Sequence, residues 1–222
     1  ELNRIYSNLC DSGYRHSLIV QDNVPGDDSS LYSLTCFVVN GDIMQWCLGR
    51  VILQDRSPQA IGNPVCIKEC SRDANVPTDE IVRQAQSLLQ GLPYDGYANF
   101  DLKFDSRDGK FRFLEVNTRP GRNTYYVELA GEPFVKPIVE HFMEHAEVER
   151  KANDKPFLYK LVPDSVIRRY VASPLSVDVI SMCRQDLARS PLFNRNDTLA
   201  HNFWSYLSYL NFIRKFKTYG AV

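Results

Sequence analysis

Two carboxylates, one amide and two arginines in residues 101–122 are the side chains of this chain that are best suited to chemistry. Asp101 lies in a run of alternating apolar and polar residues, and Glu115 and Asn117 end a second such run. Carboxylate and amide oxygens are hard ligands, which Mg²⁺ prefers and softer metals do not. Arg119 and Arg122 follow in a Pro-Gly turn, where guanidinium groups can hold a phosphate or a carboxylate. We therefore expect a magnesium site with two anion-binding arginines beside it.

A β-hairpin is the element that must bring these side chains together. Residues 96–105 alternate with a period of two, and residues 111–117 run back after an Asp-Gly pair that favours a tight turn. If the two strands pair, the two carboxylates and the amide share one face of the hairpin. The alternative is a hairpin whose acidic face is solvated and binds nothing, because short motifs have low specificity.

FLEVNTRPG, residues 113–121, resembles the metal-binding signature of the ATP-grasp superfamily, whose ligases join a carboxylate to an amine through an acyl phosphate. EVNTRPGRNTYYVELAG, residues 115–131, is most similar to the ligases related to D-aspartate ligase, which attach an amino acid to a peptidoglycan side chain. The resemblance implies ATP and Mg²⁺ as cofactors, with Mn²⁺ as a substitute, and an amino acid or peptide as substrate. Arg119 and Arg122 would act in catalysis by stabilising negative charge. The residues that would bridge the metal to the triphosphate are Asp101, Glu115 and Asn117.

The resemblance also implies a nucleotide-binding segment ahead of the first strands. In the family a hinge hydrogen-bonds adenine through its backbone, and a later carboxylate holds the ribose hydroxyls. Asp28 would hold the ribose here, and Arg50, on a following strand, would face the phosphates. The hinge itself would be Gln21, Asp22, Asn23 and Val24. The family commonly has Glu at the first hinge position, but a contact made through the backbone tolerates glutamine. The alternatives are a solvated loop and an exposed strand arginine.

The fold class that these patterns favour is α+β. Residues 31–40 and 43–53 are rich in β-branched and aromatic residues, which predicts two antiparallel strands. Residues 54–76 contain turn signals throughout and predict a long loop. Thr78 is the expected N-cap of a helix that ends at Gly91. The resemblance implies the C-terminal subdomain of the ATP-grasp fold, a mainly antiparallel sheet flanked by helices.

We expect three segments along the chain. Residues 1–148 would form the ATP-grasp subdomain, residues 149–156 a charged linker, and residues 157–222 a small helical region that begins with a helix over 157–171. Residues 201–216 are dense in aromatic side chains, with basic residues at their end. Three interpretations stay open for this last stretch: a helix packed on the main domain, which we favour, a homodimer surface, and a basic amphipathic helix on a membrane surface.

Composition excludes some classes of protein. A formal net charge of −1 over 222 residues gives no electrostatic footprint for nucleic acid. No run of about 18 apolar residues is present, so no transmembrane helix is expected. The six cysteines contain no C-x-x-C pair, which favours free thiols in a reducing, cytoplasmic location.

The segment ahead of the hinge is short for an ATP-grasp enzyme. About 20 residues precede it, and they contain neither the Gly-rich loop nor the lysine-bearing strand of the family. We therefore expect the chain to be the C-terminal part of a larger catalytic unit, with little activity on its own. The alternatives are a non-catalytic module that binds a nucleotide or a partner, and a phosphotransferase that uses the same fold without an amine.

Overall fold

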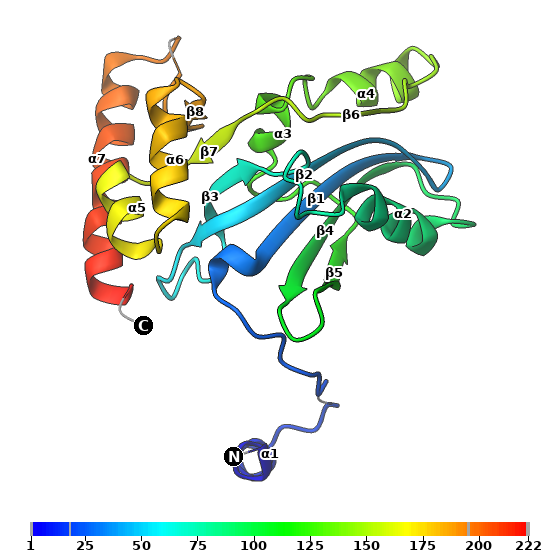
Figure 1. The fold of residues 1–222 in the computed structure, drawn as a ribbon. Helices are drawn as coiled ribbons and strands as arrows, with labels where there is room; N and C mark the ends of the chain where they lie inside the picture. Colours follow the sequence, from blue (N-terminus) through cyan, green and yellow to red (C-terminus); the bar gives the residue numbers. More distant parts are fainter. Residues whose placement is uncertain (1, 18, 195, 221–222) are drawn as a thin grey trace.

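The structure of the protein is a computed structural model, which describes residues 2–17, 19–194 and 196–220. Within these residues eight strands form one sheet in the order β5-β4-β1-β2-β3-β7-β8, with β6 beside β2 (Figure 1). The strands are β1 Leu31–Val39, β2 Asp42–Gln54, β3 Pro64–Glu69, β4 Gly96–Asp105, β5 Lys110–Asn117, β6 Lys151–Ala152, β7 Leu158–Lys160 and β8 Ala188–Arg189.

Helices flank this sheet. They are α2 Thr78–Leu89, α3 Tyr125–Leu129, α4 Lys136–Ile138, α5 Asp164–Tyr170, α6 Leu175–Arg184 and α7 Leu199–Tyr219, with short helical turns at Asp28–Ser30 and Val139–Met143. A further helix, α1 Leu2–Asp11, lies apart from the sheet at the end of an extended segment (Figure 1). The β2–β6 and β7–β8 pairs are parallel, and the other described strand pairs are antiparallel. The expected α+β class, with a mainly antiparallel sheet and a helical C-terminal region, is therefore confirmed.

Both faces of the central strands are covered, which explains the near-continuous apolar sequence of β1. Seven of its nine residues are buried. On one face Leu34 packs with Ile81 and Ala85 of α2. On the other face Ile67 of β3 packs with Tyr126 of α3. A sheet held from both sides is a rigid support for side chains at the ends of its strands.

Two secondary-structure expectations are wrong. The expected loop over residues 54–76 contains β3, which pairs with β2 through Val51 and Ile67. The expected helix over residues 157–171 begins instead with β7, which pairs with β3, and α5 starts only at Asp164. Both strands are short, and they form because neighbouring strands offer backbone partners, which local sequence patterns do not reveal.

The start of α2 also differs from the expectation. Thr78 is the first residue of the helix, and Pro77 occupies the N-cap position without a side-chain hydrogen bond. The Thr78 hydroxyl donates to the carbonyl oxygen of Ser71 at 2.9 Å. The hydroxyl therefore ties the preceding turn to the helix instead of capping it.

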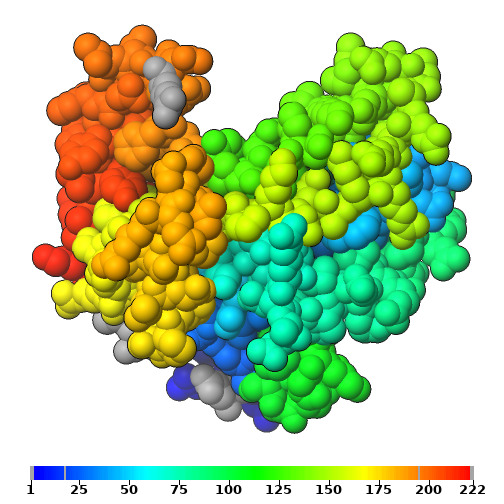
Figure 2. Space-filling view, turned by 45° about the horizontal axis from the view of Figure 1, so that its top comes forward, coloured from blue at the N-terminus to red at the C-terminus, as the bar shows by residue number. Residues whose placement is uncertain are grey.

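The expected linker and C-terminal region both add strands to the main sheet. β6 lies within residues 149–156, and the backbone N–H of the buried Asn153 donates to the carbonyl oxygen of Trp46 at 2.7 Å. β7 and β8 continue the sheet, and α5, α6 and α7 pack beside them around Val166, Ile180 and Phe216. Figure 2 shows these C-terminal helices as a lobe coloured yellow to red, with a hollow between it and the yellow-green part of the chain, which is α4 and the residues that follow it.

Candidate functional site

The β4–β5 hairpin places the two carboxylates opposite each other. Asp101 pairs directly with Glu115, and Asn99 pairs with Asn117. Directly opposed residues, and residues two apart on one strand, share a face of the hairpin, so these four side chains lie together. The pairing register shifts between Asp101 and Leu102, which is a β-bulge next to the carboxylates. Bulges of this kind re-aim side chains near functional sites.

Neither carboxylate of the pair forms an ion pair with a described residue. Burial and the facing Glu115 raise the pKa of Asp101 to about 6. Asn117 donates from Nδ2 to Glu115 Oε1 at 2.9 Å, and Asn99 donates from Nδ2 to Asp101 Oδ1 at 3.3 Å. These contacts leave other carboxylate oxygens and the Asn117 Oδ1 for a cation. Three oxygen donors with net negative charge fit Mg²⁺.

A buried network of hydrogen bonds holds Asn99, which in turn contacts Asp101. Asn99, 4% exposed, accepts through Oδ1 from Thr35 Oγ1 at 2.6 Å and from Ser33 Oγ at 3.2 Å. The Thr35 hydroxyl lies 2.7 Å from the hydroxyl of the fully buried Tyr126 on α3. The amide that contacts Asp101 is therefore fixed by three elements, β1, β4 and α3. Sequence analysis missed this support, although Asn99 lies two residues before Asp101 and so shares its face.

One pocket of about 650 Å³ contains all of the predicted metal ligands and both predicted catalytic arginines. Its other walls come from Gln21, the loop over residues 58–63 and the start of β3. Arg119 and Arg122 are exposed, and neither forms an ion pair with a described residue. The Arg122 guanidinium is therefore free to bind an anion, whereas that of Arg119 donates to the carbonyl oxygen of Pro120 at 3.2 Å and its positive charge acts on Asp101.

Asn123 is a pocket residue that sequence analysis did not single out. Its side chain is buried, lines the large pocket, and has an amide nitrogen without a hydrogen-bond partner among the described residues. A buried polar atom without a partner costs stability, so such an atom is usually kept for a reason other than folding. No sequence signal marked it beyond its place directly after Arg122.

The structure does not gather the predicted nucleotide-binding residues into one place. Gln21 lines the large pocket, whereas Asp28 and Arg50 line a smaller one of about 210 Å³. Asp28 Oδ2 accepts from the backbone N–H of Gln54 at 2.9 Å, and Arg50 Nε donates to the carbonyl oxygen of Ser29 at 2.7 Å. Both side chains thus help to hold the segment that leads into β1. Their predicted roles toward ribose and phosphate stay predictions.

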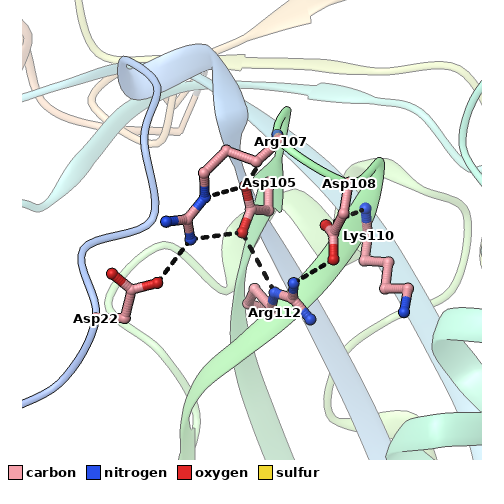
Figure 3. A network of polar contacts seen from close by, with 6 residues as sticks. All are labelled: Asp22, Asp105, Arg107, Asp108, Lys110 and Arg112. Atoms are coloured by element: carbon pink, nitrogen blue, oxygen red, sulfur yellow. Dashed lines mark hydrogen bonds and ion pairs between the residues drawn. The ribbon is translucent and has the colours of Figure 1, made fainter.

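The other hinge residues lie outside both pockets. Asn23 is exposed and Val24 half-buried. Asp22 pairs with Arg107 at 2.8 Å, so the hinge segment is attached to the hairpin turn (Figure 3). The expectation that residues 21–24 bind adenine stays a prediction.

An ion-pair network fixes the far end of the same hairpin (Figure 3). Asp105 is fully buried, and Arg107 contacts both of its carboxylate oxygens, at 2.9 and 2.8 Å. Arg112 on β5 lies 3.4 Å from Asp105 and also contacts Asp108. Hydrogen bonds from Arg107 hold the pKa of Asp105 well below its usual range. The network therefore ties β4, β5 and the hinge segment together.

Metal sites of other kinds find no support in the described part of the chain. No group of three His, Cys, Asp or Glu side chains lies close enough there to hold an ion. His141, which lies four residues before His145, contacts Asp95 at 2.8 Å instead. A metal site on the hairpin therefore depends on an amide oxygen in addition to the two carboxylates.

No family model matches the chain. D-aspartate ligase of Enterococcus faecium is 30% identical to it over 236 aligned residues, which cover 100% of this chain and 53% of that protein. The chain is a homologue of D-aspartate ligase. It spans about half of the length of this relative. The resemblance to ligases related to D-aspartate ligase, which was inferred from residues 113–131, is confirmed.

Solved structures give only distant likenesses. N5-carboxyaminoimidazole synthetase from Staphylococcus aureus, complexed with ADP, is 19% identical, with a TM-score of 0.34 over 45% of this chain and 25% of that one. L-amino acid ligase from Bacillus licheniformis is 15% identical, with a TM-score of 0.32 over the same shares.

Proposed function

We propose that the chain is the metal-binding part of an ATP-dependent ligase that joins an amino-acid carboxylate to an amine through an acyl phosphate. The observation that carries the proposal is the pair Asp101 and Glu115, opposed across the hairpin with Asn117 beside them. The homology to D-aspartate ligase supports the reaction class and suggests D-aspartate as the first carboxylate to test. A role in cell-wall peptide synthesis belongs to the same proposal.

Each of the following pocket residues would have a separate role in the reaction. Asp101, Glu115 and Asn117 would hold Mg²⁺, which when bound neutralises charge on the transferring phosphate. Asn99 would orient Asp101 through its 3.3 Å hydrogen bond. Arg119 and Arg122, which form no ion pair with described residues, would hold the anionic group of the substrate and steady the charge that develops on it.

We also propose that two parts of the catalytic unit are not contained in this chain. The lysines and the Gly-rich loop that hold the triphosphate in such enzymes would come from sequence outside this chain. The isolated chain would then bind Mg²⁺ and nucleotide but turn over slowly, because cations at the transferring phosphate contribute much of the rate.

Nucleotide binding and hydroxamate trapping test the proposal. We expect the chain to bind ATP only when Mg²⁺ is present, and Asp101→Asn to weaken this binding about tenfold or more. Asp79→Asn, at an exposed position in the first turn of α2, is the matched control and should bind as the unchanged protein does. Hydroxamate formed from D-aspartate with Mg·ATP and hydroxylamine would identify the acyl phosphate. A folded chain without any Mg²⁺-dependent nucleotide binding would contradict the proposal.

A further inference from the structure

The outer side of α7 carries a row of apolar side chains that stay exposed to solvent. Positions three and four apart share a face of a helix, and Leu199, Phe203, Leu207 and Leu210 follow this spacing. Phe203 is 57% exposed, and the flanking Trp204 is 66% exposed. On the opposite side Phe212 and Phe216 pack in the core of the C-terminal lobe. The favoured interpretation of a packed helix is thus right for one side only.

Basic side chains continue the same row. Arg214 and Lys217 follow Leu210 at helical spacing, are exposed, and form no ion pair with a described residue. α7 contains no Asp or Glu. Exposed Arg168 and Arg169 lie on α5, which packs on α7 through Tyr170 and Phe216, with ring centroids 5.2 Å apart. The outer side of α7 is therefore apolar at one end and cationic at the other.

The C-terminal region as a whole carries a net positive charge, like the end of α7. Residues 157–222 contain nine Lys and Arg against four Asp and Glu, whereas residues 1–156 contain 17 against 23. The four acidic side chains all lie within ion-pair distance of a basic one. They are Asp164, Asp178, Asp186 and Asp197. The excess positive charge of this region is thus left for an anionic partner.

We propose that this row of α7 binds an anionic lipid surface. Aromatic and leucine side chains enter the boundary between headgroups and acyl chains, and nearby Lys and Arg attract anionic headgroups. A second copy of the chain fits less well, because a stable dimer usually buries about 800 Å² from each partner over some 20–30 residues. The row is narrower than that, and in a parallel symmetric pair its cationic end would meet another cationic end. In an antiparallel pair the cationic end would meet the apolar end of the other copy, where no Asp or Glu of α7 is present to pair with it.

Vesicle binding by the whole chain tests this proposal. We expect co-sedimentation with vesicles of phosphatidylcholine mixed with phosphatidylglycerol, and little with phosphatidylcholine alone. Phe203→Ser combined with Leu207→Ser should weaken binding about tenfold or more, since two apolar anchors are lost. Arg214→Gln combined with Lys217→Gln should weaken it about tenfold and reduce its dependence on salt. Because all four positions are exposed, the unfolding midpoint should change little in either variant.

Matched controls and a spectroscopic readout complete the test. Val177→Ser replaces a side chain that is 66% exposed on the neighbouring α6 and should leave vesicle binding unchanged. The fluorescence of Trp204 should shift to the blue with anionic vesicles, while the partly buried Trp46 remains unchanged. Failure of the unchanged chain to bind anionic vesicles would overturn the proposal, as would binding that the Phe203 and Leu207 changes do not reduce. If the unchanged chain forms a dimer that these changes dissociate, and binds no vesicles, then the partner of this row is a second copy of the chain and not lipid.

Discussion

Asp101 and Glu115 face each other across the β4–β5 pair, and burial of the first together with the charge of the second raises the pKa of Asp101 to about 6. A fold that holds two carboxylates this close lowers its own stability when both are ionised. Such an arrangement is understandable if a cation belongs between them, because the cation reverses the sign of the interaction.

Replacement of Asp101 should stabilise the metal-free protein. Asp101→Asn removes one of two opposed charges, and we expect the free energy of unfolding at neutral pH to rise by about 1–2 kcal/mol, since one pKa unit corresponds to about 1.4 kcal/mol and solvent screens part of the effect. Urea unfolding without divalent ions measures this change. Adding Mg²⁺ should raise the unfolding midpoint of the unchanged protein but not that of the variant. If the variant is less stable than the unchanged protein when no divalent ion is present, then Asp101 and Glu115 do not repel each other as proposed.

Tyr126 should act on Asp101 through the buried network. Tyr126→Phe removes the hydroxyl that contacts Thr35 at 2.7 Å and donates to the carbonyl oxygen of Ser33 at 3.2 Å. We expect the free energy of unfolding to fall by about 1–3 kcal/mol, because buried polar partners are left without a hydrogen bond. We also expect weaker Mg²⁺-dependent nucleotide binding. Tyr125→Phe, on an exposed neighbour in the same helix, is the control and should change neither quantity.

Asp105 should make the protein sensitive to acid. Its pKa is lowered by hydrogen bonds from Arg107, so its stabilising effect is complete above the unfolded value of about 4 and is lost as the pH falls below that value. Asp105→Asn should therefore lower the unfolding midpoint at neutral pH, with a difference that shrinks toward about pH 3. Asp11→Asn, at an exposed position of α1, should show no such difference. A difference that grows in acid would contradict the assignment.

Asn123 should show opposite effects on stability and on binding. Asn123→Leu removes a buried amide whose nitrogen has no partner among the described residues, and we expect the unfolding midpoint to stay the same or to rise. Binding of a carboxylate substrate in the large pocket should weaken about tenfold, since a donor to a charged group is lost. Asn211→Leu, at an exposed position of α7, is the control for a new leucine. Lower stability with unchanged binding would show that Asn123 serves the fold.

The sequence by itself determined that a hairpin forms and that it carries two carboxylates and an amide. A period of two on residues 96–105, followed by an Asp-Gly turn, indicated the hairpin, but the register that begins at the turn pairs Leu102 with Phe113 and would place Asp101 opposite Leu114. The β-bulge between Asp101 and Leu102, which no local pattern indicated, shifts the pairing by one residue and brings Glu115 and Asn117 onto the face of Asp101. β1 and β2 were evident from their β-branched and aromatic residues, and they too are neighbours along the chain.

Only the tertiary structure decided which residues come into contact when they are far apart along the chain. β3 and β7 form because strand edges are available to them, and the link from Tyr126 through Thr35 and Asn99 to Asp101 joins residues up to 91 positions apart. No local pattern encodes such contacts, because they arise from packing both faces of one sheet. For the same reason, the sequence showed that α7 is aromatic, but only its packing showed which side stays exposed.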